Sequence, residues 1–252
     1  MKRSRVLEIA QAEIGYLEKK SNESLDSKTI NAGKKNFTKY WRDICPNLQG
    51  SAWCQCFVNW VMWQAENKDA ETARHNIGQG GTWTFYTPDA VSRAKQWGLW
   101  TQGTAEIQPG DIIYFYGYVS SEGKNRVHHV EIVEKVTESE IFTIGGNTAA
   151  GQGVIDNGGQ VARKKYMIGD AALYGYIRPK YDAEVPEDQK IGWHKDNSGW
   201  WCRHTEGIGP DTYYHDTVAE INGKFYAFDK NGYMIEDAGK IGIRKSGELY
   251  VR

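Results

Sequence analysis

The spacing of hydrophobic residues changes once between the N-terminus and residue 181, and this change limits which folds the chain can adopt. Up to Gly98 hydrophobic residues recur at helical intervals, and helices are predicted at 5–15, 53–65 and 87–98. After Gly110 short stretches rich in β-branched and aromatic residues alternate with Gly, Asn and Asp. They predict strands at 112–116, 127–136, 140–144, 161–166 and 173–178. Helices followed by neighbouring strands favour an α+β domain with an antiparallel sheet.

The remainder of the chain has a different character. Residues 182–190 are polar and include Pro186, which is typical of a linker. Beyond them Trp, Tyr, Gly and polar turns dominate, and the segments 192–201 and 221–233 predict β-hairpins with turns at 197–199 and 229–232. We therefore expect a large domain at 1–181, a linker at 182–190 and an aromatic-rich β-hairpin module at 191–252.

The overall charge excludes some partners. The chain has 31 Lys plus Arg and 32 Asp plus Glu, a formal net charge of -1. This balance gives no electrostatic reason to expect nucleic acid or an anionic membrane as a partner. The first residues lack the apolar run of a signal peptide, and no stretch approaches the roughly 18 apolar residues of a membrane span. We expect a chain that is synthesised in the cytoplasm without a signal peptide.

Cys54 lies where the predicted 53–65 helix begins, with Ser51 as the expected N-cap. Unpaired N–H groups and the positive end of the helix dipole favour an anion there. Such a position typically lowers the pKa of a thiol, which produces the thiolate that a nucleophile requires. The alternative for any single cysteine is a buried, unreactive thiol.

A nucleophilic cysteine needs a base, and His129 in the predicted strand 127–136 can provide one. Asn147 follows the next predicted strand and could orient the imidazole. Each residue also has a plain structural interpretation. His129 and its neighbour His128 could both lie on the surface of a strand, and an Asn after two glycines often forms a turn.

Three segments carry a family resemblance. The sequence W-C-Q-C-F-V at 53–58 resembles the W-C-x-x-F-V segment of CHAP domains, which are relatives of the NlpC/P60 and papain-like peptidases. P-G-D-I-I at 109–113 and H-V-E-I-V at 129–133 resemble two further segments of the family, in the same order. The resemblance covers roughly residues 1 to 180, and the pattern around Asn147 and 157–161 is similar to phage endolysins of Gram-positive hosts. It implies a papain-like fold with Cys54 as nucleophile and His129 as base.

The sequence departs from the family pattern at two positions. The E-x-N pattern often found at the orienting position is Gly145-Gly146-Asn147 here, so Asn147 would have to orient the imidazole alone. The small residue usually found two places after the histidine is Glu131, for which solvent exposure is expected ahead of a role in orienting the ring. Some CHAP domains bind calcium through an acidic N-terminal loop, but Asp26 alone does not make that pattern. No metal or cofactor is predicted.

The C-terminal hairpins resemble choline-binding-type cell-wall repeats, which stack aromatic rings around quaternary ammonium groups or sugars. The predicted wall-binding residues are Trp193, Trp200, Trp201 and Tyr226. About one and a half repeats are present, and Cys202 replaces a usual aromatic residue. The alternative is a small β-module in which these rings form the core.

The resemblance implies a peptidoglycan hydrolase that cleaves an amide bond of the bacterial cell wall by cysteine nucleophilic catalysis. N-acetylmuramoyl-L-alanine amidase and endopeptidase activities both fit, in a phage or prophage endolysin that acts on the wall after release. The expected partners are peptidoglycan and choline-type or sugar ligands of the wall. Two alternatives remain: a non-catalytic wall-binding or phage structural protein with a degenerate papain-like fold, and a cytosolic cysteine peptidase acting on proteins.

Overall fold

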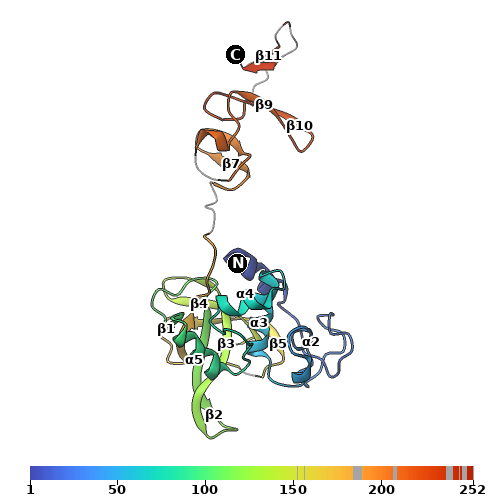
Figure 1. Cartoon of the computed structure of the whole chain (residues 1–252), viewed down its shortest axis with the longest axis vertical. Helices are drawn as coiled ribbons and strands as arrows, with labels where there is room; N and C mark the ends of the chain where they lie inside the picture. Colours follow the sequence, from blue (N-terminus) through green and yellow to red (C-terminus); the bar gives the residue numbers. More distant parts are fainter. Residues whose placement is uncertain are drawn as a thin grey trace. The chain divides into compact units, whose positions relative to one another are not determined.

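The computed structural model describes residues 1–151, 153–155, 157–183, 189–206, 209–236, 241–243, 245 and 249–251. The chain divides into two compact units, Met1–Asp182 and Ala183–Arg252, which are described separately below (Figure 1). Within the described residues, no helix has both the length and the apolar character needed to cross a bilayer.

The helices of the first unit precede its main sheet in the chain. They are α1 (Arg3–Ala12), α2 (Lys39–Ile44), the 3₁₀ helix η1 (Pro46–Leu48), α3 (Cys54–Ala65), α4 (Ala70–Asn76) and α5 (Thr87–Gln96). The three predicted helices correspond to α1, α3 and α5. Helices α2 and α4 were not predicted, since they have only six and seven residues and show too little of a helical repeat. Helix α3 is buried on nearly all sides, with every residue from Cys54 to Met62 buried.

Six antiparallel strands form one sheet in the order β1-β6-β2-β3-β4-β5. The strands are β1 (Trp100–Gln102), β2 (Ile112–Val119), β3 (Lys124–Val136), β4 (Glu140–Thr148), β5 (Gln160–Met167) and β6 (Leu173–Ile177). All five predicted strands are present, and the α+β class is confirmed. The far end of the β2–β3 hairpin extends beyond the rest of the unit (Figure 1).

Two clusters of buried side chains hold the first unit together. The larger one joins α1, α2, α3 and α5 to the sheet and includes Val130 and Ile132 of β3. The smaller one includes Phe115 and Tyr166. Because side chains alternate along a strand, residues 129 and 131 of β3 face away from Val130 and Ile132. The His129 ring accordingly lies 5.8 Å from the Phe115 ring, between centroids.

The second unit consists of small two-stranded sheets. Its elements are β7 (Gly192–Asp196), β8 (Gly199–Arg203), the 3₁₀ helix η3 (Pro210–Thr212), β9 (Thr217–Ile221), β10 (Lys224–Phe228), β11 (Ile241–Ile243) and β12 (Leu249–Val251). The first predicted hairpin is β7–β8. The turn predicted at 229–232 is present, since Gly232 N–H donates to Asp229 O at 2.9 Å and Phe228 forms an antiparallel bridge with Met234. Strands β9 and β10, however, are joined at Asn222-Gly223, a turn that was not predicted. Both residues have positive φ, 52° and 75°, as a tight hairpin turn of type I′ requires.

Candidate functional site

Cys54 is the first residue of α3, at the end of the helix where backbone N–H groups lack helical partners. The expected cap at Ser51 was wrong, since Trp53 is the N-cap residue and its side chain makes no capping hydrogen bond. The helix start is fixed by packing instead, with the Trp53 indole Nε1 donating to Glu18 Oε2 at 3.0 Å. Cys54 keeps 7% of its surface exposed, whereas Cys56 is fully buried and burial raises the pKa of its thiol well above the usual value.

Strand β4 approaches the start of α3 closely at Gly146. A Cβ atom added there would lie 2.5 Å from the Phe57 Cβ and 2.9 Å from the Trp53 ring. Real Cβ atoms do not approach other atoms so closely, so only glycine allows the strand to pass here. Gly146 thus lets the end of β4 pack directly against the first turn of α3, the turn that carries Cys54.

His129 on β3 is fully buried, and Cys54 lies near enough to its ring to raise the pKa of the imidazole. Its Nε2 lies 3.1 Å from Glu131 Oε1, while its Nδ1 is buried without a hydrogen-bond partner among the described residues. Nδ1 is therefore the ring atom left for the sulfur. Burial by itself lowers the pKa of His129, but Cys54 and Glu131 raise it by more, so that the pKa is about 10. The site therefore favours a protonated imidazole at His129.

Glu131 is fully buried, so the expectation of solvent exposure was wrong. Its carboxylate accepts hydrogen bonds from three strands: Oε1 faces His129 and also accepts from the Tyr166 hydroxyl at 3.2 Å, and Oε2 accepts from the Thr143 hydroxyl. Burial and the charge of Glu131 raise the pKa of Tyr166 above its usual range, which keeps this donor protonated. Several donors offset the cost of burying the carboxylate.

Asn147 lies at the end of β4 with 1% of its surface exposed. Its Nδ2 is 3.4 Å from Asn157 Oδ1, and its own Oδ1 is buried without a hydrogen-bond partner in the described structure. The described residues show no hydrogen bond between Asn147 and His129. The structure thus brings together Cys54, His129 and Glu131, and Glu131 makes the contact to the ring that was expected of Asn147.

Part of the first unit is similar to a known protein family. Residues 46–147 match the CHAP domain family. The matched segment contains Cys54, His129, Glu131 and Asn147. A curated relative, the protein named Lysin of Pneumococcus phage Dp-1, is 31% identical over 72 residues, which are 29% of this chain. The match spans 23% of the length of that relative.

Solved structures of low similarity also match. They include Ly7917 (TM-score 0.42, 16% identity, 100% of this chain and 92% of that chain) and the wild-type endolysin LysIME-EF1 (TM-score 0.38, 12% identity, 81% and 80%). Ly7917 has also been solved with the hydrolyzing product of MDP (TM-score 0.41, 16% identity, 99% and 92%).

No group of three or more His, Cys, Asp or Glu side chains in the described part of the chain is arranged to hold a metal ion. Asp26 instead forms an ion pair with Arg42 at 2.7 Å.

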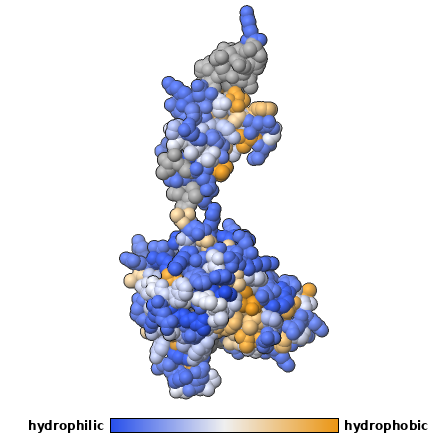
Figure 2. All heavy atoms as spheres, viewed as in Figure 1, coloured by the Kyte–Doolittle hydropathy of each residue, from blue (hydrophilic) through white to orange (hydrophobic). Residues whose placement is uncertain are grey.

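In the second unit, three of the four predicted wall-binding residues line one apolar pocket of about 360 Å³. Trp193, Trp200 and Tyr226 form its walls together with Met234. The Trp193 and Tyr226 rings lie 4.8 Å apart at 67°. Strongly hydrophobic residues are exposed on the surface of this unit (Figure 2), and its exposed apolar side chains include Ile191 and Phe225. The buried interior is formed by Cys202, Ala227 and Phe228, so the pocket aromatics are not all used as core.

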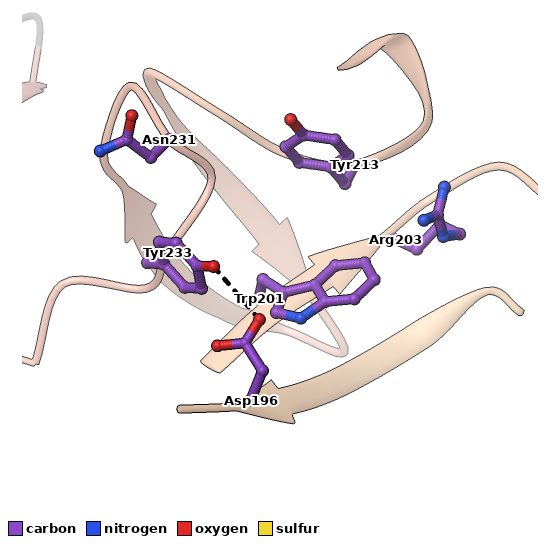
Figure 3. Close-up of a pocket in the computed structure, with 6 residues that line it drawn as sticks. All are labelled: Asp196, Trp201, Arg203, Tyr213, Asn231 and Tyr233. Atoms are coloured by element: carbon purple, nitrogen blue, oxygen red, sulfur yellow. Dashed lines mark hydrogen bonds between the residues drawn. The ribbon is translucent and has the colours of Figure 1, made fainter. Parts of the chain in front are cut away.

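Trp201 lies elsewhere, in a second and more polar pocket of about 210 Å³ (Figure 3). Its ring stacks on His194, with 4.3 Å between centroids and an interplanar angle of 20°. The Tyr233 hydroxyl donates to Asp196 Oδ2 at 3.1 Å, and Arg203, Tyr213 and Asn231 complete the lining. Trp201 therefore does not share a pocket with Trp193, Trp200 and Tyr226. Neighbouring residues of a strand point to opposite faces, which separates Trp200 from Trp201.

Proposed function

We propose that this chain is a peptidoglycan hydrolase of the endolysin type, which cleaves an amide bond of the cell wall with Cys54 as nucleophile. The observation that carries the proposal is the proximity of Cys54, at the start of α3, to the buried imidazole of His129, whose pKa it raises. The CHAP match and the name of the phage relative support it. In this proposal residues 1–181 are the catalytic domain and 191–252 bind the wall, after the protein is released from the cytoplasm.

The chemistry follows from the two side chains. The Cys54 thiolate attacks the amide carbonyl, and N–H groups at the start of α3 stabilise the oxyanion. His129 gives its proton to the leaving amine, which departs and leaves a thioester on Cys54. His129 then accepts a proton from water, the resulting hydroxide attacks the thioester, and the acid product leaves as the thiolate is restored. Asn147, with its unpaired Oδ1, lies in the same segment and remains a candidate for binding substrate.

The variant Cys54→Ala tests the nucleophile, and Cys56→Ala, on the same helix, is its matched control. We expect Cys54→Ala to lose about 10³-fold or more of the clearing of purified cell walls, as removal of a catalytic nucleophile does. Cys56→Ala should retain most activity, apart from a lower melting temperature caused by the small cavity. Clearing by Cys54→Ala as fast as by the parent protein would refute the hydrolase and favour a non-catalytic wall protein.

The bond that is cut can be identified from the products. Mass spectrometry of digested walls would reveal new amino termini on L-alanine for an amidase, and on another residue of the stem or cross-bridge for an endopeptidase. Casein cleavage without release of wall fragments would favour a peptidase acting on proteins. We expect release of wall fragments with a single class of new amino terminus.

We infer that the pocket of Trp193, Trp200, Tyr226 and Met234 binds a quaternary ammonium group such as choline on the wall. Its lining is uncharged and presents three aromatic rings, each of which can contribute about 0.5–2 kcal/mol to binding of a cation. One ring of the pocket already contacts a cation, since the Lys195 ammonium lies 5.2 Å from the Trp200 ring. A sugar is the alternative ligand, because aromatic rings also stack on sugars.

Trp193→Ala and Trp201→Ala are a matched pair for this inference, because the two tryptophans lie on one hairpin but line different pockets. Choline binding, followed by calorimetry on the full chain, should fall about tenfold or more in Trp193→Ala and change little in Trp201→Ala. Equal losses in both variants, or binding of an N-acetylated sugar but not choline, would argue against the quaternary ammonium site.

A further inference from the structure

Glu131 and Gly145 face each other across the β3–β4 ladder. Ile132 pairs with Ile144 and Val133 with Thr143, so the next step of the same register places residue 131 opposite residue 145. A Cβ atom added to Gly145 would lie 2.7 Å from both Cγ and Oε1 of Glu131. Side chains at these two positions would therefore fill the same space.

The backbone conformation at position 145 does not itself require glycine. Its backbone is not in the left-handed region, so its conformation is open to any residue. Its nearest neighbours at the added Cβ are all atoms of the Glu131 side chain. Gly146 differs, because its space is taken by Phe57 and Trp53 of the first turn of α3. The Glu131 side chain thus takes the space that a side chain at 145 would need.

The carboxylate is held in place from outside the catalytic pair. Thr143 on β4 donates to Oε2 and Tyr166 on β5 donates to Oε1, which leaves Oε1 directed at His129 Nε2 at 3.1 Å. Tyr166 in turn packs on Phe115, with 4.8 Å between ring centroids, and Phe115 lies beside the His129 ring. The contact at Nε2 fixes the orientation of the ring and leaves Nδ1 for Cys54.

We infer that Glu131 is the positioning residue for His129, and that it supplies from β3 the carboxylate that the E-x-N pattern would supply from position 145 of β4. The inference rests on the proposed pairing of Cys54 with His129. In this arrangement Glu131 fixes the tautomer of the imidazole and stabilises its charged form, while Asn147 has no part in holding the ring. The inference predicts that a carboxylate placed at position 145 of β4 can replace the one at position 131 of β3 and restore activity.

Four variants of the full chain test this exchange: Glu131→Gln, Glu131→Ala, Gly145→Glu, and the double variant Glu131→Ala with Gly145→Glu. Glu131→Gln keeps the size of the side chain and removes only its charge, so we expect it to fold and to clear walls about 10²-fold more slowly. Gly145→Glu alone should fold poorly, because two carboxylates would compete for one space. The double variant should clear walls at least tenfold faster than Glu131→Ala.

A second readout separates positioning from a purely structural role. The rate at which iodoacetamide alkylates Cys54 reports the thiolate–imidazolium pair and needs no peptidoglycan. In Glu131→Gln alkylation near neutral pH should slow and its rise with pH should move towards that of an ordinary thiol, because the charged imidazole that stabilises the thiolate has lost its carboxylate. An unchanged pH profile in Glu131→Gln would overturn the inference, as would a double variant that folds but is no more active than Glu131→Ala.

The two proposals fail in different ways in this experiment. If the parent protein does not clear walls but its alkylation profile shifts in Glu131→Gln, the positioning role stands and the proposed function is wrong. If the parent clears walls and the profile of Glu131→Gln equals that of the parent, the function stands and Glu131 does not position His129. Loss of folding in the double variant leaves the decision to Glu131→Gln, whose side chain is close in size to glutamate.

Discussion

Replacing Cys54 with alanine should change the titration of His129. In the parent protein the pKa of this imidazole is raised from 6.5 to about 10, although burial by itself lowers it. At about 1.36 kcal/mol per unit, that rise corresponds to roughly 5 kcal/mol in favour of the charged ring, supplied by Cys54 and Glu131. Cys54→Ala removes one of the two favourable interactions and leaves the burial, so the pKa should fall by at least one unit.

The sign of the effect determines the activity profile. Because the folded-state pKa of His129 is raised, the imidazolium is fully present at low pH and is lost as the pH rises through about 10. The basic limb of wall clearing should therefore lie near pH 10 and not near the usual 6.5 of histidine. A bell-shaped profile would assign this limb to the catalytic pair, which titrates as a unit.

Nuclear magnetic resonance of the full chain with isotope-labelled histidine, titrated from about pH 5 to 11, measures this directly. Cys56→Ala is the control, since it removes a buried thiol from the same helix and leaves the Cys54–His129 contact intact. Its His129 should titrate as in the parent. A parent His129 that titrates between about pH 6 and 7, or the same value in Cys54→Ala and the parent, would refute the thiolate–imidazolium pair.

Three further predictions concern stability. Gly146→Ala places a Cβ atom 2.5 Å from the Cβ of Phe57. It should therefore lower the free energy of unfolding by about 1–3 kcal/mol in denaturant melts and slow wall clearing. Values equal to those of the parent protein would contradict this close packing. Burial raises the pKa of Glu134, but hydrogen bonds from Arg163 outweigh it and hold this pKa below its usual value. The stability that these hydrogen bonds provide is therefore lost as the pH falls through the folded-state pKa of Glu134. Arg163→Ala should therefore cost about 0.5–1 kcal/mol at neutral pH and almost nothing in acid, and an equal cost at both would be evidence against the pair. Gly223→Ala should destabilise the second unit by about 1 kcal/mol, because φ is 75° there, and an unchanged melt would contradict this turn.

The first unit was predictable wherever the signal was local. Strands β2 to β6 carry dense β-branched and aromatic residues, and α3 shows a hydrophobic run that begins at Cys54. The short helices α2 and α4 are formed by packing against the rest of the unit and leave almost no repeat in the sequence. In the second unit Asn-Gly occurs at 222–223 and at 231–232 and both form turns, so the dipeptide alone could not show which of them joins β9 to β10. The cross-strand register of β9 and β10 decides it, with Lys224 opposite Ile221.

Cys54 and His129 were predictable because each lies in a recognisable segment, whereas the role of Glu131 depends on three strands. A lone carboxylate on a strand is usually solvated, since burying it without partners is costly. Its partners Thr143 and Tyr166 are 12 and 35 residues away in the chain, and the sequence around Glu131 does not indicate them. Burial of Glu131 therefore follows from the fold and not from its own segment.

One signal of this arrangement was nevertheless present in the sequence. A glutamate at 131 and a glycine at 145 were each a departure from the family pattern, and each alone argues against an oriented imidazole. Strand pairing changes their meaning, because positions 131 and 145 share one space and only one of them can hold a side chain there. The two departures are then a single exchange that keeps one carboxylate at His129 Nε2. A change at only one of the two positions would leave that space with two carboxylates or with none. We therefore expect positions 131 and 145 to change together among chains with this fold.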